Sequence, residues 1–116
     1  MSRTLLKPLL VALALAAPVA VHAQDSAPLV IEMTDGVVAP QRLELTAGAT
    51  VTILVRNTGT TAAEFESKRL RKEIVVAPGA ETQFSLRGLP AGEYKFVDEF
   101  HEDMDSAQGV IVVGPK

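Results

Sequence analysis

Residues 50–57 read TVTILVRN and show the clearest alternation of apolar and polar side chains in the chain. Val51, Ile53 and Val55 fall on one face of an extended strand, and threonine and arginine side chains fall on the other. A period of two predicts a β-strand that buries one face. The Asn-Thr-Gly sequence at 57–59 is a turn signal that ends this strand.

Short apolar runs of the same kind extend along the chain in both directions. Gly- and Pro-containing turn signals separate them roughly every 8 to 12 residues, which is typical of an all-β sandwich. We therefore predict a Greek-key β-sandwich of seven or eight strands. Only one stretch, 67–73, is a candidate helix, with Ser67 as its cap. The further strands are expected at 29–33, 42–46, 74–77, 82–86, 93–100 and 109–113.

The first 23 residues have the features of a secretory signal peptide. Arg3 and Lys7 form a positive start, an apolar run covers 9–17, and Val-His-Ala at 21–23 gives a cleavage site after Ala23. The apolar segment has about 13 residues, whereas a membrane span needs about 20. We expect a periplasmic protein with residues 24–116 as a single domain and no membrane span.

The composition of residues 24–116 limits the partners. Without Arg3 and Lys7, the 11 basic residues fall to nine against 14 acidic residues, a net charge of about −5. This charge argues against nucleic acid or an anionic lipid surface as a partner. The chain has no cysteine, so no disulfide can stabilise it and the apolar core must do so.

The most unusual segment is 98–105, DEFHEDMD, which holds five carboxylates and His101, the only histidine after residue 23. If Tyr94 and Phe96 face the core, the period of two also turns Asp98 inward. A buried carboxylate is costly unless it is paired or binds a metal. A bound cation would also relieve the repulsion between so many like charges. The alternative is a solvated acidic loop.

A second acidic pair, Glu64 and Glu66, shares one face of an extended segment. Carboxylates with one imidazole suit iron, manganese, zinc or copper(II). Thiolate is absent, so a blue-copper centre lacks its defining ligand. The basic residues of 68–72 are either a solvated loop or a docking patch for an acidic partner.

The C-terminal half resembles a known family. Residues 92–100, GEYKFVDEF, followed by GVIVV at 109–113, are similar to the last hairpin of a cupredoxin. In this resemblance the copper-binding Cys, His and Met positions fall on Asp98, Asp103 and Ala107, so all three ligands are replaced. The upstream histidine position falls on Glu66 or Glu64.

A narrower resemblance rests on FES at 65–67, LRKE at 70–73 with VVAPG at 75–79, and DEFH at 98–101. These strings are similar to cupredoxin-like proteins of bacterial iron transport. That group includes the small periplasmic component accompanying a ferrous iron permease and the cupredoxin-like domain of EfeO-type proteins. The resemblance implies a bound iron ion (Fe2+ or Fe3+), with copper as a further metal. It also implies an inner-membrane permease and another periplasmic iron-binding component as partners.

We therefore predict a metal site whose first ligands are Asp98, His101 and Glu66. The further candidates are Glu64, Glu102 and Asp103, and Glu99 is expected near the entrance. The resemblance implies a ferroxidase-type role, in which Fe(II) is oxidised before transport. Two alternatives remain: a carrier or scaffold without redox chemistry, and a structural domain whose acids are solvated.

Overall fold

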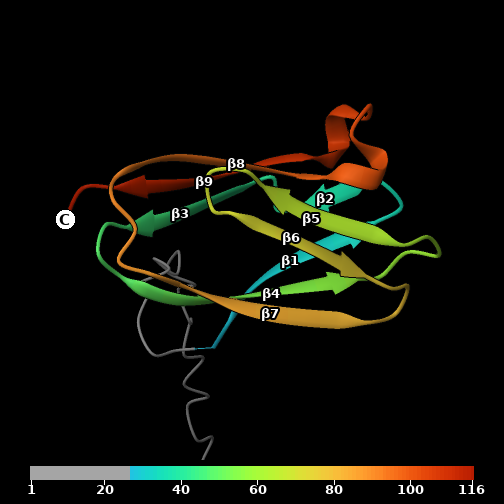
Figure 1. Ribbon diagram of the computed structural model, residues 1–116, viewed down its shortest axis with the longest axis horizontal. Coiled ribbons are helices and arrows are strands. Elements are labelled where there is room, and N and C mark those ends of the chain that lie inside the picture. The colour runs from blue at the N-terminus through green and yellow to red at the C-terminus, as the bar shows by residue number, and fades with distance from the viewer. Residues whose placement is uncertain (1–26) are drawn as a thin grey trace, which may run out of the picture.

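The computed structural model describes residues 27–116, so the predicted signal peptide at 1–23 lies outside the described residues. Nine strands form two facing sheets, and two short 3-10 helices precede the last strand (Figure 1). The strands are β1 (Leu29–Thr34), β2 (Val37–Ala39), β3 (Arg42–Thr46), β4 (Thr50–Asn57), β5 (Ala63–Ser67), β6 (Lys72–Val76), β7 (Glu81–Arg87), β8 (Gly92–Asp98) and β9 (Gln108–Gly114); the helices are η1 (Glu99–His101) and η2 (Asp105–Ala107).

The smaller sheet has four strands in the order β2-β1-β4-β7. Strand β4 pairs in parallel with β1 and antiparallel with β7. Its alternation works as the sequence predicts, because Val51, Ile53 and Val55 are all buried. Their side chains form one wall of the core.

The larger sheet has five strands in the order β3-β9-β8-β5-β6. Strand β9 lies inside this sheet, parallel to β3 and antiparallel to β8. Tyr94, Phe96 and Asp98 of β8 point inward and are buried, whereas Glu93 and Lys95, which alternate with them, are exposed. The larger sheet therefore has one apolar face and one polar face.

Three aromatic rings fill the space between the sheets. The ring centroid of Phe65 lies 5.1 Å from that of Phe84 and 5.1 Å from that of Phe96. Gly109, opposite Phe96 in the β8–β9 ladder, leaves room for its ring, because a Cβ at this position would collide with it. These contacts join the two sheets without a disulfide.

The all-β sandwich is confirmed, with differences in its elements. Strands β2 and β5 were not among the predicted runs. The candidate helix at 67–73 is instead the turn of the β5–β6 hairpin, where the Arg71 N–H donates to the Lys68 carbonyl and Arg71 has a φ of 55°. Among residues 27–116, no helix is long and apolar enough to cross a membrane.

Candidate metal site

Asp98 ends strand β8 and, as predicted, points inward, with 0% of its surface exposed. Its Oδ1 accepts a hydrogen bond of 3.0 Å from the backbone N–H of Glu64. Its Oδ2 lies 2.7 Å from Nδ1 of His101, which donates to it. Both oxygens have a protein partner, so Asp98 acts here as a buried acceptor that joins β8, β5 and η1.

His101 is fixed on both sides of its ring. The bond to Asp98 orients Nδ1, and Nε2 lies 3.2 Å from Oγ1 of Thr61. The Thr61 hydroxyl in turn donates to Oδ1 of Asp35 at 2.7 Å. Hydrogen bonds from Thr61 and Thr60 lower the pKa of Asp35 below its ordinary value. In metal-binding histidines, the ring nitrogen that does not bind the metal commonly donates a hydrogen bond to a carboxylate. Asp98 is in that position at Nδ1 of His101.

A cluster of three carboxylates lies on the outer face of the larger sheet, on β5, β6 and η1. One carboxylate oxygen from each of Glu64, Glu73 and Glu99 lies within 4.8 Å of the others. The local fold explains this meeting, because Glu64 and Glu66 point to the outer face while Phe65 points inward. Glu73 is directly opposite Glu66 in the hairpin. We call these three glutamates, together with Glu66, the carboxylate cluster.

The carboxylate cluster is electrostatically strained. Burial, followed by the neighbouring carboxyl of Glu66 and the charges of Glu64 and Glu73, raises the pKa of Glu99 to about 7. Burial, followed by the Glu73 carboxyl, also raises the pKa of Glu64. Glu64 is only 8% exposed, and Oε2 of Glu99 is buried without a hydrogen-bond partner. A cation would partner this oxygen and neutralise the repulsion.

The structure places the predicted site residues in two neighbouring groups. Glu64 and Glu66 belong to the carboxylate cluster, whereas Asp98 and His101 form a pair on the inner side of the same strands. The Glu64 backbone N–H connects the two groups. Glu102 and Asp103 are exposed in the loop after η1.

Glu73 was absent from the sequence-based site. Glu73 could have been found by pairing 63–67 with 72–76 as a hairpin. We did not pair these segments from the sequence, because 67–73 was considered as a candidate helix.

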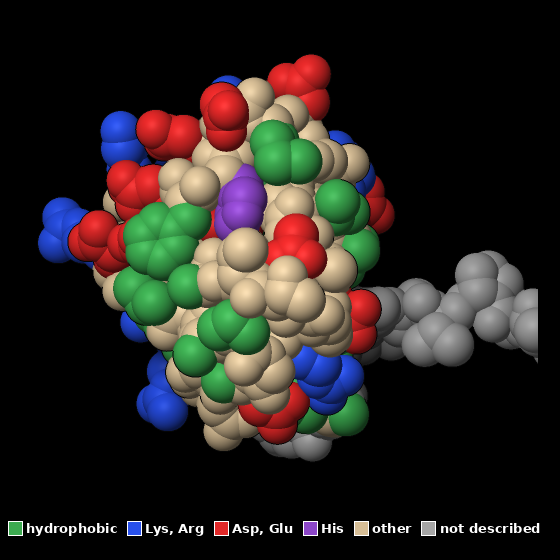
Figure 2. Space-filling model, turned by 90° about the vertical axis from the view of Figure 1, so that its right-hand side faces the viewer, with side chains coloured by type: hydrophobic (Ala, Val, Ile, Leu, Met, Phe, Trp, Pro, Cys, Tyr) green, Lys and Arg blue, Asp and Glu red, His purple; other side chains and the backbone are tan. Residues whose placement is uncertain are grey.

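The end of the sandwich near η1 and η2 also carries exposed apolar side chains. Phe100 is 51% exposed, Val37 48% and Met104 38%. Figure 2 views this end and shows hydrophobic and acidic side chains surrounding a histidine. The side chain of His101 is 20% exposed, so its ring is accessible from this end.

These observations define a cupredoxin-like β-sandwich with acidic side chains at one end. The chain belongs to the family of cupredoxin-like domains, whose family model matches residues 6–113. The uncharacterized protein RP394 of Rickettsia prowazekii (strain Madrid E) is 31% identical over 83 residues, covering 72% of this chain. The chain spans 65% of the length of that relative.

Solved structures share the fold at low sequence identity. Purple cupredoxin from Nitrosopumilus maritimus is 22% identical with a TM-score of 0.52; the alignment covers 73% of this chain and 98% of that chain. Auracyanin from Roseiflexus castenholzii is 16% identical with a TM-score of 0.59, covering 78% and 98%. The Cu-containing nitrite reductase of Thermus scotoductus is 19% identical with a TM-score of 0.62, covering 76% of this chain and 27% of its own.

The residues present do not fit a cupredoxin copper centre with a thiolate ligand. The chain has no cysteine, and Asp98, at the position that resembles the cysteine ligand, already has both oxygens hydrogen-bonded. Ala107, at the methionine position, is a buried apolar residue, and Asp103, at the histidine position, is exposed. The fold is therefore that of a cupredoxin, whereas the donor set is different.

Proposed function

We propose that this protein binds iron as its cargo in a ferrous iron uptake system, with the carboxylate cluster as the binding site. The observation that carries the proposal is the buried, unpartnered Oε2 of Glu99 beside Glu64 and Glu73. Carboxylates are costly to hold together without a cation, and the raised pKa of Glu99 reflects that cost.

The donor set supports a hard cation. Carboxylate oxygens suit Fe(II), Fe(III) and Mn(II), and several negative charges favour the trivalent ion most. A site that binds Fe(III) more tightly than Fe(II) lowers the reduction potential of the bound ion. Each Fe(II) would then lose one electron more readily to dioxygen or to a partner protein, which is ferroxidase-type assistance. Copper is the alternative metal, and the accessible ring of His101 supports it as a nitrogen donor.

One observation favours a carrier without redox chemistry. The carboxylate cluster lies at the edge of the larger sheet, because β6 is the last strand, and Glu73 on β6 is exposed. A cation bound there would be accessible to solvent on one side, so that it could be transferred to another protein. We propose an inner-membrane iron permease and a second periplasmic iron-binding component as recipients, on the basis of the resemblance described above.

An anaerobic Fe(II) titration followed by calorimetry tests the site. We expect saturable binding near one equivalent, weakened at least about tenfold by Glu64→Gln or Glu99→Gln, since each removes a charged ligand. Glu44→Gln is the matched control, because Glu44 is an exposed glutamate on β3 of the same sheet. His101→Ala decides whether the imidazole belongs to the ligand set.

The same samples separate the two roles. Opened to air, a redox protein present in sub-stoichiometric amounts speeds the loss of Fe(II), whereas a carrier only sequesters one equivalent. If the two glutamine variants bind Fe(II) as the wild type does, the carboxylate cluster is not the site.

A further inference from the structure

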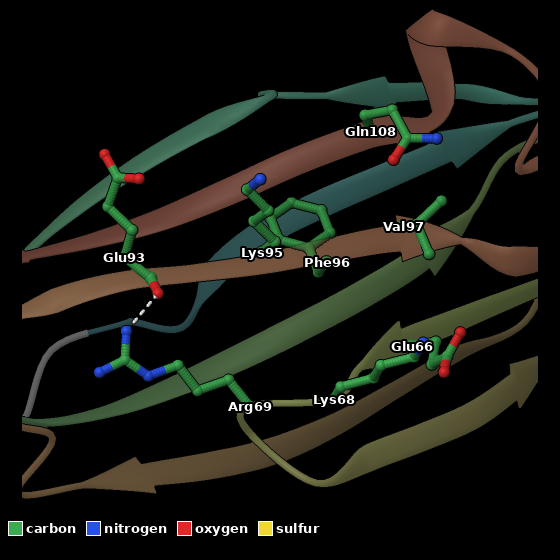
Figure 3. Close-up of a pocket in the computed structure, with 8 residues that line it drawn as sticks. All are labelled: Glu66, Lys68, Arg69, Glu93, Lys95, Phe96, Val97 and Gln108. Carbon is green, nitrogen blue, oxygen red and sulfur yellow. Dashed lines mark hydrogen bonds between the residues drawn. The ribbon is translucent and has the colours of Figure 1, made fainter.

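An open groove of about 530 Å³ lies on the outer face of the larger sheet (Figure 3). The residues that line it come from β5, the following turn, β8 and β9. They are Glu66, Lys68, Arg69, Glu93, Lys95, Phe96, Val97 and Gln108. Its volume is within the range of small-molecule sites.

Two of the three cations around this groove are available to a ligand. Arg69 is already engaged, because its Nη1 donates to the Glu93 carbonyl at 2.7 Å and its guanidinium lies 4.4 Å from the Tyr94 ring centre. Lys68 and Lys95 are exposed, and neither forms an ion pair in the described part of the chain. The groove therefore has two ammonium groups without a direct ion pair, although the carboxylates of Glu66 and Glu93 also line it.

The groove adjoins the carboxylate cluster. Glu66 lines the groove and stands opposite Val97 on one side and Glu73 on the other. Lys68 extends along the groove towards Glu66 (Figure 3). A second hollow of about 260 Å³, which includes Glu66, Glu73, Arg71 and Lys72, continues the same charge pattern. Acidic and basic side chains thus meet along one surface, with Glu66 at the boundary.

We infer that the groove binds a small polycarboxylate that accompanies the metal ion, so that the cargo is a metal chelate and not a bare ion. This inference rests on the proposed function. A chelate of this class has a cationic centre and anionic outer groups. The cluster matches the centre, and Lys68 and Lys95 match the outer carboxylates.

The groove favours a polycarboxylate over inorganic phosphate. Val97 is half-buried and, with the alkyl stems of the two lysines, offers an apolar surface to a carbon skeleton. Phosphate has no carbon skeleton to contact that surface. Lys68, which the proposed function leaves without a role, thereby forms part of one extended site, and Arg69 holds the turn beside it through its bond to the Glu93 carbonyl.

Equilibrium dialysis with radiolabelled citrate tests the inference. The protein is loaded anaerobically with one equivalent of Fe(II) and compared with the metal-free protein. We expect about one citrate retained per iron-loaded chain, with the affinity lowered at least about tenfold in the double variant Lys68→Gln/Lys95→Gln. Arg87→Gln, which removes an exposed positive charge from β7 of the other sheet, should leave retention unchanged. Binding of Fe(II) without citrate should be unaffected by either change.

The outcomes distinguish the groove from the metal site. Fe(II) binding without citrate retention, or citrate drawing the iron off the protein, overturns the inference and leaves the proposed function standing. Citrate retained equally by the wild type and the double variant also overturns it. Displacement of citrate by an equal concentration of phosphate overturns the assignment to polycarboxylates. Lysine-dependent citrate retention without any Fe(II) binding refutes the proposed function and overturns the assignment of a metal chelate as the cargo.

Discussion

Asp98 and Glu99 are adjacent carboxylates with opposite surroundings. Asp98 points inward, where a backbone N–H and an imidazole satisfy both of its oxygens. Glu99 starts η1 and points toward the carboxylate cluster, where one of its oxygens has no partner. The change from strand to 3-10 helix separates the two side chains, so that one stabilises the fold and the other is available to a cation.

The pKa of Glu99 predicts how metal-free stability depends on pH. The folded protein holds this proton up to about pH 7, whereas the ordinary pKa of a glutamate is 4.5. The folded state therefore binds more protons than the unfolded state between these values, and the free energy of unfolding falls as the pH rises through this window. Urea unfolding at several pH values, with a chelator present, measures the effect.

Glu99→Gln is the control for this dependence, because glutamine is neutral throughout. The difference in stability between the variant and the wild type should widen in favour of the variant from about pH 5 to about pH 8. A constant difference would show that Glu99 ionises as it does in the unfolded chain. The pKa of Asp35 is lowered instead, so its contribution is lost only in stronger acid, outside this window.

At the residue scale, the sequence predicted the direction of a side chain correctly where the alternation along a single strand determines that direction. The inward direction of Asp98 follows from Tyr94 and Phe96 by the period of two, and the structure confirms it. The meeting of Glu73 with Glu64 depends on the pairing register of a hairpin. A single strand contains no information about its partner's register, so the sequence pattern did not reveal Glu73.

The β8–β9 hairpin is the element that joins the core to the candidate site. Its outer strand positions line the groove, and its inner positions hold Phe96 against Phe65. Gly109 is essential to this packing, because any side chain there occupies the space of the Phe96 ring. The core packing and the groove thus share one pair of strands.

Gly109→Ala should lower the free energy of unfolding by about 1–3 kcal/mol, since the added methyl group forces Phe96 from its position. Gly114→Ala on the same strand is the matched control, because its Cβ would make an ordinary contact of 3.8 Å with the Leu45 carbonyl oxygen. Thermal and urea unfolding measure both. Equal stability of the two variants would mean that Phe96 has room to move.

Elements with a clear alternation or a continuous apolar run were predicted from the sequence, and those with neither were not. Strand β4 alternates, and its bounds match the predicted run. Strand β5 reads AEFES and has only one large apolar residue, Phe65, so its pattern is weak. Strand β2 has three residues. Both strands are defined by their hydrogen bonds to neighbouring strands, β2 to β1 and β5 to β6 and β8, and not by their own sequence patterns.

At the scale of the whole molecule, the two faces of the larger sheet have separate tasks. The inner face supplies the core that holds the fold together without cysteine. The outer face carries the carboxylate cluster at its η1 end and the basic groove beside it. The fold class was predictable because it depends on the inner face. The arrangement of side chains on the outer face was not predictable, because it depends on which strands are neighbours in the sheet.

The interior place of β9 in the larger sheet has a consequence for the biosynthesis of the chain. Strand β9 contacts β3 on one side and β8 on the other, and it supplies the buried Ile111 and Val113. We expect a chain that lacks 108–116 to show no cooperative unfolding transition by circular dichroism, whereas removal of 115–116 should have little effect. A cooperative transition in the shorter chain would contradict this.

The larger sheet can close only after residues 108–114, which form β9, have been synthesised. Until then, β3 and β8 have no strand between them. A chain with this strand order cannot complete the larger sheet strand by strand, because β3 and β8 acquire their shared neighbour only when residues 108–114 are present.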